Sequence, residues 1–344
     1  MKKKLLLLTH ALLLCFFNPF HSTGEELLNH KKVDMENEYI GFPGPFIPIN
    51  DGFIGIEFNK NSPPLLQLKQ INAQYVVTHF GNRGQGPGDF ITVSNIQVIN
   101  KDLVGVFDRG SSSYFEFPTS NVENMINNKK VKFERSYFRV IKTNDSQYIG
   151  LSTEDGLFHI MDSAGEKKEV FFEYPFKDKN EQSKNNSSRA MSYQGLLETN
   201  PQKTKFAYAS QNGEILHFYQ IDKNQITLIN KIEKAYPVSE TININNSPIS
   251  RLDFKNTEKG YISLYASDKY LYALYCGKKI IELIEGMAVI DMGTQVRVFD
   301  WNGKLIRTLQ LDVPCQQICV SPDEKRLWAF ALIPEATPVF FELE

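Results

Sequence analysis

The chain has 344 residues, of which 42% are hydrophobic and 23% are charged, a composition typical of a soluble globular protein. Its 38 basic and 40 acidic residues give a net charge of −2. Without the three lysines at the extreme N-terminus the balance is 35 to 40, and the resulting charge of −5 excludes a general attraction to nucleic acid or anionic lipid. Aromatic residues make up 12% of the chain, which favours strands.

The first 24 residues have the pattern of a secretory signal peptide. Lys2–Lys4 precede an apolar run, Leu5–Phe17, that is too short to span a bilayer comfortably. Ser22 and Gly24 suit the −3 and −1 positions of a cleavage site, so cleavage is expected near Gly24; a retained N-terminal anchor is the alternative. No later segment approaches 18 apolar residues. We therefore expect an exported chain of the periplasm or cell envelope, with no transmembrane span.

The cysteines do not form an obvious disulfide framework. Cys15 follows Leu14, where a lipoprotein signal needs a small residue, so we interpret Cys15 as part of the discarded leader and a lipid anchor there as the alternative. The remaining three are odd in number, so at least one is unpaired within the chain. Cys315 and Cys319 lie roughly 13 Å apart along one expected strand, too far for a disulfide. Cys276 paired with either stays open, but buried packing is the favoured interpretation.

After a charged segment at residues 25–37, expected to be a flexible lead-in, the chain reads as short strands separated by turn residues. Tyr39–Asp51 is rich in Gly and Pro and is not expected to be a central strand throughout, although Glu38–Phe42 can pair at an edge. The first three groups of strands are expected at Phe53–Phe58, Leu65–Lys69 and Tyr75–Phe80; at Ile91–Ile99, Leu103–Phe107, Tyr114–Phe117 and Val131–Glu134; and at Phe138–Lys142, Tyr148–Ser152, Leu157–Asp162 and Lys168–Tyr174. The last three are expected at Met191–Glu198, Phe206–Ala209, Ile215–Ile221 and Ile226–Ile232; at Tyr261–Ala266, Tyr270–Tyr275, Val296–Phe299 and Leu305–Leu311; and at Gln316–Val320, Leu327–Leu332 and Val339–Leu343.

Two stretches interrupt this rhythm. Lys177–Ser188 contains no apolar residue and is expected to be a mobile surface loop. Gly277–Gly293 is a longer insertion, in which Ile280–Ile284 is either a helical turn or an extra strand. No amphipathic helix of ten residues or more is expected.

The groups recur with a period that indicates a β-propeller. Equivalent strands centre near Leu66, Phe115, Ile160, Phe218, Val298 and Phe341, so the steps are 49, 45, 58, 80 and 43 residues. About four strands per 40 to 50 residues is typical of propeller blades, whereas a β-sandwich would not keep this period. We therefore predict an all-β, six-bladed β-propeller spanning 38–344 as a single domain. The sixth group is one strand short, and Glu38–Phe42 is expected to supply that strand and close the ring.

Three motifs carry a resemblance to a known family. Gly84-Gln85-Gly86-Pro87-Gly88-Asp89-Phe90 follows the first group, Tyr270–Gly277 reads YLYALYCG, and Val298–Lys304 reads VFDWNGK. In these motifs, and over the stretch from about Tyr39 to Glu344, the chain resembles the TolB-like six-bladed β-propeller proteins of the Bacteroidales cell envelope. Many members carry a lipobox, from which this sequence departs at Leu14. The resemblance implies the fold and an envelope location, but no mechanism.

The most unusual local run is Gly81–Asp89, GNRGQGPGD. Its glycines expose backbone N–H groups and Arg83 adds a positive charge, so Arg83 and Asp89 are candidate ligand-binding residues for an anionic or carbonyl-bearing group. It is neither a Rossmann loop nor a P-loop, because no helix and no Gly-Lys-Ser/Thr follows. The alternative is a connection between blades, in which both residues only hold the loop.

No catalytic motif or metal-ligand spacing is present. His30, His79, His159 and His217 lack a second His or Cys at ligand spacing. We therefore expect no metal, no cofactor and no catalytic residue, and a monomeric module that binds an envelope protein, peptide or glycan. The alternative is a lactonase-like propeller hydrolase with a metal or acid/base site in the central channel, which needs carboxylates, Asn or His from several blades.

Overall fold

The computed structural model describes residues 25–36, 40–50, 52–71, 74–120, 122, 129–143, 147–244, 247–285 and 291–344. The leader expected at residues 1–24, with Cys15, lies outside the described residues, as do Glu38 and Tyr39. Over the described ranges, no helix has both the length and the apolar character needed to cross a membrane.

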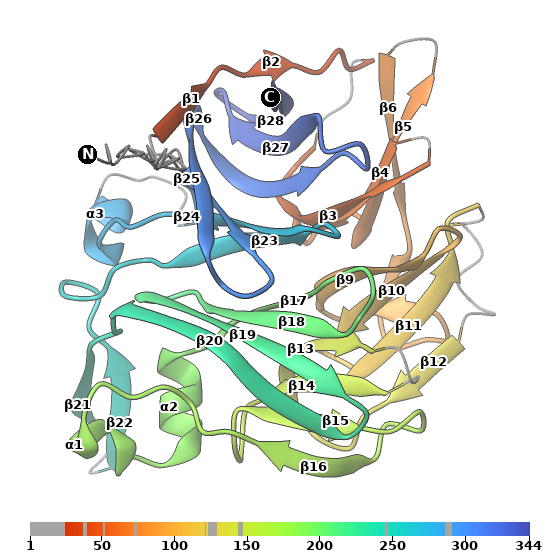
Figure 1. Ribbon diagram of the computed structural model, residues 1–344. Helices are drawn as coiled ribbons and strands as arrows, with labels where there is room; N and C mark the ends of the chain where they lie inside the picture. The colour runs from red at the N-terminus through yellow and green to blue at the C-terminus, as the bar shows by residue number, and fades with distance from the viewer. Residues whose placement is uncertain are drawn as a thin grey trace, which may run out of the picture.

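Most of the described chain forms four-stranded antiparallel sheets that lie around a common centre (Figure 1). The first three blades are β3 (Pro43–Ile49), β4 (Gly52–Glu57), β5 (Leu65–Ile71) and β6 (Gln74–Phe80); β9 (Val93–Asn100), β10 (Leu103–Asp108), β11 (Ser113–Pro118) and β12 (Lys129–Lys132); and β13 (Tyr137–Lys142), β14 (Tyr148–Ser152), β15 (Phe158–Met161) and β16 (Lys167–Phe171). The fourth blade is β17 (Gly195–Thr199), β18 (Lys205–Ser210), β19 (Glu214–Asp222) and β20 (Gln225–Ala235), and the fifth begins with β23 (Tyr261–Ala266), β24 (Tyr270–Tyr275) and β25 (Gly293–Asp300).

The last two blades share one long strand. The first part of β26 (Leu305–Val320) pairs with β25 and completes the fifth blade. Its second part pairs with β27 (Arg326–Leu332), which pairs with β28 (Ala336–Glu342), so it is also the innermost strand of the sixth blade. The six-bladed propeller expected from the period is thereby confirmed, and all six residues used to count the period lie in the third strand of their blades.

The fourth strand of the sixth blade comes from the N-terminal region, but not from the expected residues. β2 (Lys31–Lys32) pairs antiparallel with β28, and β1 (Glu25–Leu28) pairs parallel with Thr308–Leu311 of β26. Residues 40–42 form no strand. Gly41 and Phe42 instead donate their N–H groups to the buried Glu57 carboxylate, at 3.0 and 2.7 Å. A ring-closing role for the N-terminal segment stays a prediction.

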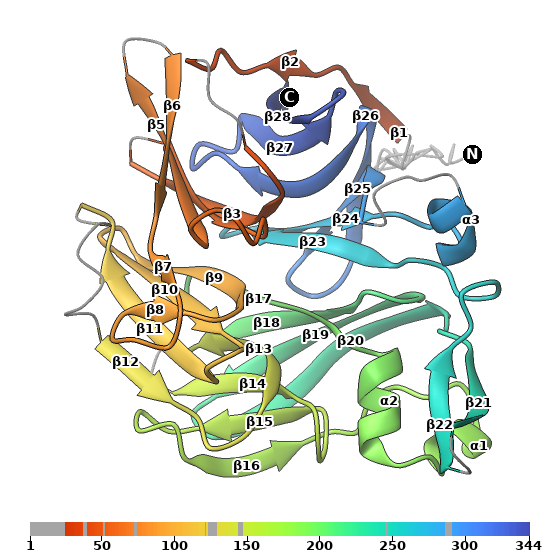
Figure 2. The ribbon, with the colours of Figure 1, turned by 180° about the vertical axis from the view of Figure 1, so that it is seen from behind.

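Residues 25–33 therefore differ from the flexible lead-in that their charge suggested. Two of their three apolar side chains, Leu28 and Val33, are only 7% and 9% exposed. Leu28 packs in the core of the fifth and sixth blades, and Val33 packs in the core of the first and sixth blades. Burial of these side chains and strand pairing fix a segment whose other residues face solvent. Figure 2 shows this segment running along the outside of β26 and β28.

The innermost strand of the first blade, β3, was not expected because it contains Pro43, Pro45 and Pro48. An innermost strand pairs on one edge only, and proline is tolerated on an unpaired edge because no ladder hydrogen bond is lost there. In the ladder, β3 pairs with β4 alone.

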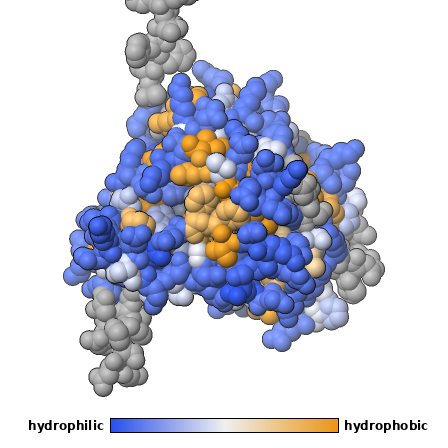
Figure 3. Space-filling view, turned by 60° about the horizontal axis from the view of Figure 1, so that its bottom comes forward, coloured by the Kyte–Doolittle hydropathy of each residue, from blue (hydrophilic) through white to orange (hydrophobic). Residues whose placement is uncertain are grey.

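The apolar core lies between neighbouring blades. Phe46 packs on Phe330 with ring centroids 4.7 Å apart, which joins the first blade to the sixth. Phe158 and Phe206 join the third blade to the fourth at 5.1 Å. The surface seen in Figure 3 is mostly hydrophilic with an apolar patch near its middle. Phe172 is one of the exposed apolar residues of the chain. Its ring packs against Phe158 and Tyr219 and so extends this inter-blade core to the surface.

The insertions are more ordered than their composition suggests. The stretch Lys177–Ser188, expected to be a mobile loop, contains α1 (Lys179–Gln182) and the start of α2 (Asn186–Ser192), and the side chains of Asp178 and Asn185 cap these helices. Because α2 runs to Ser192, the strand expected from Met191 begins only at Gly195. α3 (Ile280–Glu285) confirms the helical turn. A hairpin of β21 (Ser239–Ile244) and β22 (Ser247–Leu252), which was not expected, precedes the fifth blade.

Candidate functional site: the central cavity

The glycine-rich loop is tied to the first blade by its own side chains. Its residues form a small parallel pair, β7 (Asn82–Arg83) with β8 (Asp89–Phe90). The Arg83 guanidinium donates to three backbone carbonyls, those of Ser62 at 2.8 Å, Glu57 at 2.7 Å and Asn59 at 3.1 Å. Asp89 accepts from Gly86 N at 2.9 Å. These contacts hold the loop, and a ligand-binding role for Arg83 and Asp89 stays a prediction.

Arg83→Ala is expected to lower the free energy of unfolding by about 2–4 kcal/mol, because three carbonyls lose charge-assisted hydrogen bonds. Urea unfolding measures this loss, with the exposed neighbour Lys60→Ala as a control expected to stay within about 0.5 kcal/mol of the wild type. Unchanged stability, with loss of binding to an envelope extract, would assign Arg83 to a ligand instead.

A cavity of about 400 Å³ lies at the centre of the ring. All six innermost strands line it, through residues such as Phe46, Gln97, Arg139, Glu198 and Gln317. The remaining lining residues include turn residues that follow four of these strands, at 101, 200–201, 267–268, 321–322 and 324. The cavity therefore opens where the innermost strands end. The loop 81–89 precedes the start of β9, lies at the opposite end of that strand, and none of its residues lines the cavity.

Two amide side chains in the cavity wall are used to join the blades. Asn95 Nδ2 donates to the carbonyl of Val140 at 3.1 Å. Gln97 exchanges two hydrogen bonds with the backbone of Lys142, at 3.0 and 2.8 Å, and also accepts from Tyr114. These bonds link β9 to β13 in place of a backbone ladder. The hydrogen bonds of these two amides therefore join neighbouring blades, and the amides are not candidate ligand-binding groups.

Three other polar groups in the wall retain unused hydrogen-bonding capacity. Among the described residues, Arg139 donates only to its neighbour's carbonyl, Phe138 O, at 2.9 Å. Glu198, within the same described part of the chain, accepts only from Thr199 N, at 3.2 Å. Gln317 is 8% exposed and its Oε1 has no partner within the described structure. Buried polar atoms of native proteins are normally paired with protein or ordered water, so the unpaired Gln317 acceptor can take a hydrogen bond from water or from a bound group.

Burial shifts the protonation of the two ionisable groups. It raises the pKa of Glu198 from 4.5 to about 8, an effect that the hydrogen bond from Thr199 only partly opposes. Burial, followed by repulsion from Arg109, lowers the pKa of Arg139 to about 10. At neutral pH the cavity therefore contains a charged guanidinium and a neutral carboxyl group.

Glu198→Gln is expected to stabilise the chain in alkaline solution. The folded chain keeps a proton on Glu198 that the unfolded chain releases near pH 4.5, so stability falls as pH rises from there to about 8. Glutamine cannot titrate, so the variant should gain roughly 2 kcal/mol at pH 9 and little at pH 4, allowing for partial exposure of the side chain. Urea unfolding at both pH values measures this, with the exposed Glu335→Gln as control. A difference that is the same at both pH values contradicts the assignment.

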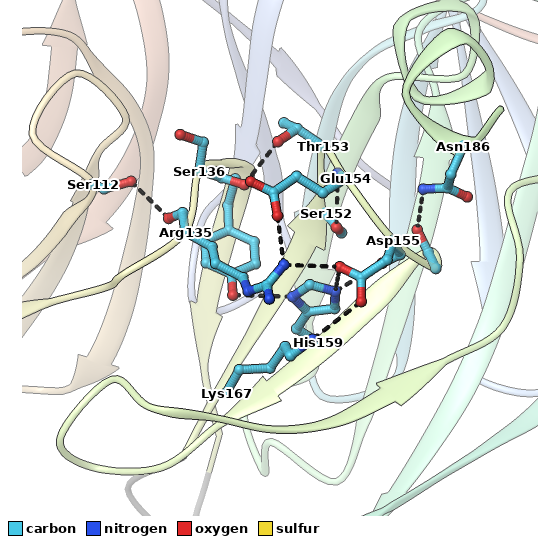
Figure 4. Close-up of polar contacts among 12 residues, drawn as sticks. Ser112, Arg135, Ser136, Ser152, Thr153, Glu154, Asp155, His159, Lys167 and Asn186 are labelled. Carbon is cyan, nitrogen blue, oxygen red and sulfur yellow. Dashed lines mark hydrogen bonds and ion pairs between the residues drawn. The ribbon is translucent and has the colours of Figure 1, made fainter.

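A second polar network lies in the third blade (Figure 4). The fully buried His159 bonds Tyr137 through Nδ1 at 3.1 Å, and through Nε2 it contacts Asp155, whose carboxylate also pairs with Arg135 and Lys167. Both ring nitrogens are thus occupied and burial lowers the His159 pKa. This network fixes the ends of the strands in its blade and leaves no free nitrogen for a substrate.

The remaining sequence candidates are dispersed. His217 pairs with Glu233 at 2.9 Å, in a network separate from that of His159. Cys276, Cys315 and Cys319 are all free, and the last two are buried as expected. Within the described ranges, no group of three or more His, Cys, Asp or Glu residues is arranged to hold a metal ion.

Known proteins resemble the chain mainly in fold. Two crystal structures from Bacteroides fragilis match it at 12% identity: a "putative exported protein" with a TM-score of 0.54, covering 91% of this chain and 94% of that one, and a "putative 6-phosphogluconolactonase" with a TM-score of 0.47, covering 88% and 80%. The Swd1 β-propeller domain of Myceliophteria thermophila matches at 8% identity and a TM-score of 0.48, covering 92% and 100%. No curated protein matches the sequence. The model of the family described as "TolB-like 6-blade propeller-like" matches residues 51–323, most of the chain, and the chain therefore belongs to that family.

Proposed function

We propose that this chain is an exported propeller that binds a ligand in its central cavity without covalent chemistry. The observation that carries the proposal is the cavity itself, in which Arg139, Glu198 and Gln317 from three different blades retain free hydrogen-bonding capacity. Concave sites with apolar walls and a few polar groups are the usual form of ligand sites. At about 400 Å³, this one suits a small molecule or one end of an envelope peptide or glycan.

Obstructing the cavity tests this proposal. Glu198→Trp adds bulk inside the cavity, and Pro322→Trp adds it at the exposed rim. Ile91→Trp is the matched control, because Ile91 is 41% exposed and does not line the cavity. Each purified variant is incubated with a small-molecule extract of the cell envelope, and the retained compounds are identified by mass spectrometry after denaturation. Loss of the same compound from both cavity variants, with melting temperatures and the control unchanged, supports the proposal; retention by all variants contradicts it.

Export rests on the leader, and the exported description of the Bacteroides fragilis protein is consistent with it. We propose that residues 1–24 are removed and that the mature chain resides in the periplasm or cell envelope as a monomer. Intact-mass measurement of the protein from its native envelope tests this. A chain beginning at Met1 would contradict cleavage, and an added lipid mass at Cys15 would replace it with a lipid anchor.

A second candidate is a hydrolase that uses Glu198 as a general acid. The observation in its favour is the raised pKa of a carboxyl group inside a cavity, which is frequent at active sites. Hydrolysis of a lactone panel that is lost in Glu198→Gln would establish this candidate, whereas hydrolysis that survives in Glu198→Gln, or binding by the wild type without any hydrolysis, would reject it.

A further inference from the structure

Arg139 lies in the cavity without a counter-ion. Within the described structure no carboxylate lies in ion-pair distance of its guanidinium, which has five donors and uses one of them on Phe138 O. Asp291 attracts the Arg139 guanidinium from a longer distance. Its carboxylate is already paired with Lys259, at 2.6 Å. Arg139 is partly buried, and a charge withdrawn from water is costly unless an opposite charge accompanies it. The free guanidinium therefore favours an anionic group on the ligand.

The surroundings of Arg139 strengthen this preference. The exposed Arg109 guanidinium lies 4.8 Å from the centre of the Phe138 ring and adds positive charge from outside the cavity. Glu198, the carboxyl group on the neighbouring innermost strand, is neutral at pH 7 and cannot serve as the counter-ion. An oxyanion is the group that a guanidinium binds best, through two parallel hydrogen bonds.

The opposite side of the cavity has an unpaired hydrogen-bond acceptor. Gln317 belongs to the sixth blade, three blades away from that of Arg139, and its buried Oε1 is unpaired. Between these two groups the wall includes the buried apolar side chains of Phe46, Ile262 and Ile318. The cavity is therefore positive at one side, apolar along its walls and hydrogen-bond accepting at the other side.

We propose that the ligand is a small amphipathic oxyanion, whose carboxylate or phosphate binds Arg139, whose apolar body lies along the cavity wall, and whose distal O–H or N–H donates to Gln317. The inference rests on the proposed ligand-binding function and specifies the chemical class of the ligand.

Calorimetric titration with matched probes tests this. 8-Hydroxyoctanoate is expected to bind at least tenfold more tightly than 1,8-octanediol, which lacks the oxyanion, and severalfold more tightly than octanoate, which lacks the donor. 8-Hydroxyoctyl phosphate is the fourth probe, and the tighter of the two anions identifies the oxyanion as carboxylate or phosphate.

Two variants assign these preferences to their residues. Arg139→Gln should reduce the preference for the acid over the diol to about one, while Arg109→Gln, which removes a guanidinium outside the cavity, should preserve most of it. Gln317→Leu should remove the preference for 8-hydroxyoctanoate over octanoate and leave the preference for the anion intact. Melting temperatures establish that each variant is folded.

Equal binding of acid and diol by the wild type, or failure of the folded wild type to bind any probe, would overturn the inference. The obstruction experiment decides the proposed function independently, because it uses envelope compounds of any charge. A retained neutral compound would leave the proposed function standing while the oxyanion inference falls.

Discussion

A chain that begins at residue 34 is expected to lose about 3–5 kcal/mol of unfolding free energy relative to one that begins at Glu25. The deletion removes the two buried side chains Leu28 and Val33, and the strands that pair with β26 and β28. It also removes the contact of His30 with Asp312, which are joined by an N–H donation at 3.1 Å and a side-chain contact at 2.9 Å. The newly unpaired edges should in addition promote aggregation.

Urea unfolding of chains 25–344 and 34–344 measures this loss. Two single variants in β1 test whether burial causes the loss. Leu28→Ala should lower the unfolding free energy by about 2 kcal/mol or more. Leu27 is 64% exposed, so Leu27→Ala should change the unfolding free energy by less than about 0.5 kcal/mol. Equal stability of the two chains would refute a ring-closing role for the N-terminal segment.

Lys142→Met is expected to destabilise the chain by about 3–5 kcal/mol, because it leaves the charge of Glu116 buried without its main partner. The Lys142 Nζ atom lies 2.7 Å from Glu116 Oε1, and the two residues are 8% and 6% exposed. Tyr148 also donates to that oxygen, at 3.3 Å. Lys129 is more distant at 3.7 Å and half exposed, so it replaces the lost charge only in part.

A double-mutant cycle checks the cause. Lys142→Met combined with Glu116→Gln should be clearly more stable than Lys142→Met alone, since no charge is then left unpaired. Arg251→Met removes one side of the solvent-exposed pair with Glu240 and should cost less than about 1 kcal/mol. If the losses of the two single variants simply add in the double variant, the ion pair is not the source of the effect.

The strand groups were predictable because each blade repeats a local pattern, and local patterns are what a sequence displays directly. The departures involve side chains that act over longer distances. The strand β3 was not predicted because it contains Pro43, Pro45 and Pro48, which its unpaired edge tolerates. Glu57 accepts hydrogen bonds from the amides of Gly41 and Phe42, so residues 40–42 form no strand, and it is Lys31–Lys32 that pairs with β28. The helices α1 and α2 were not predicted because their residues are mostly polar. The signal that could have identified them is the pair of N-cap residues, Asp178 and Asn185.

The cavity residues could not be predicted in the same way. Arg139, Glu198 and Gln317 are far apart in the sequence, and only the arrangement of the blades around a common centre brings their strands around one space. Arg139 lies between two apolar residues, whereas Glu198 and Gln317 each have one apolar and one polar neighbour, so none of the three gives more than a weak signal alone. The loop 81–89 attracted attention through its unusual composition, but the structure explains that composition by the need to hold a tight connection between two blades.

Hydrogen–deuterium exchange of the mature chain, with and without the small-molecule envelope extract, tests the central claim most directly. Occupation of the cavity should slow exchange at the innermost strand ends and their turns, around 95–101, 196–203, 262–268 and 317–324, and leave loop 81–90 unchanged. Slower exchange confined to loop 81–90, or no change anywhere in the chain, would contradict the assignment of the central cavity as the ligand site.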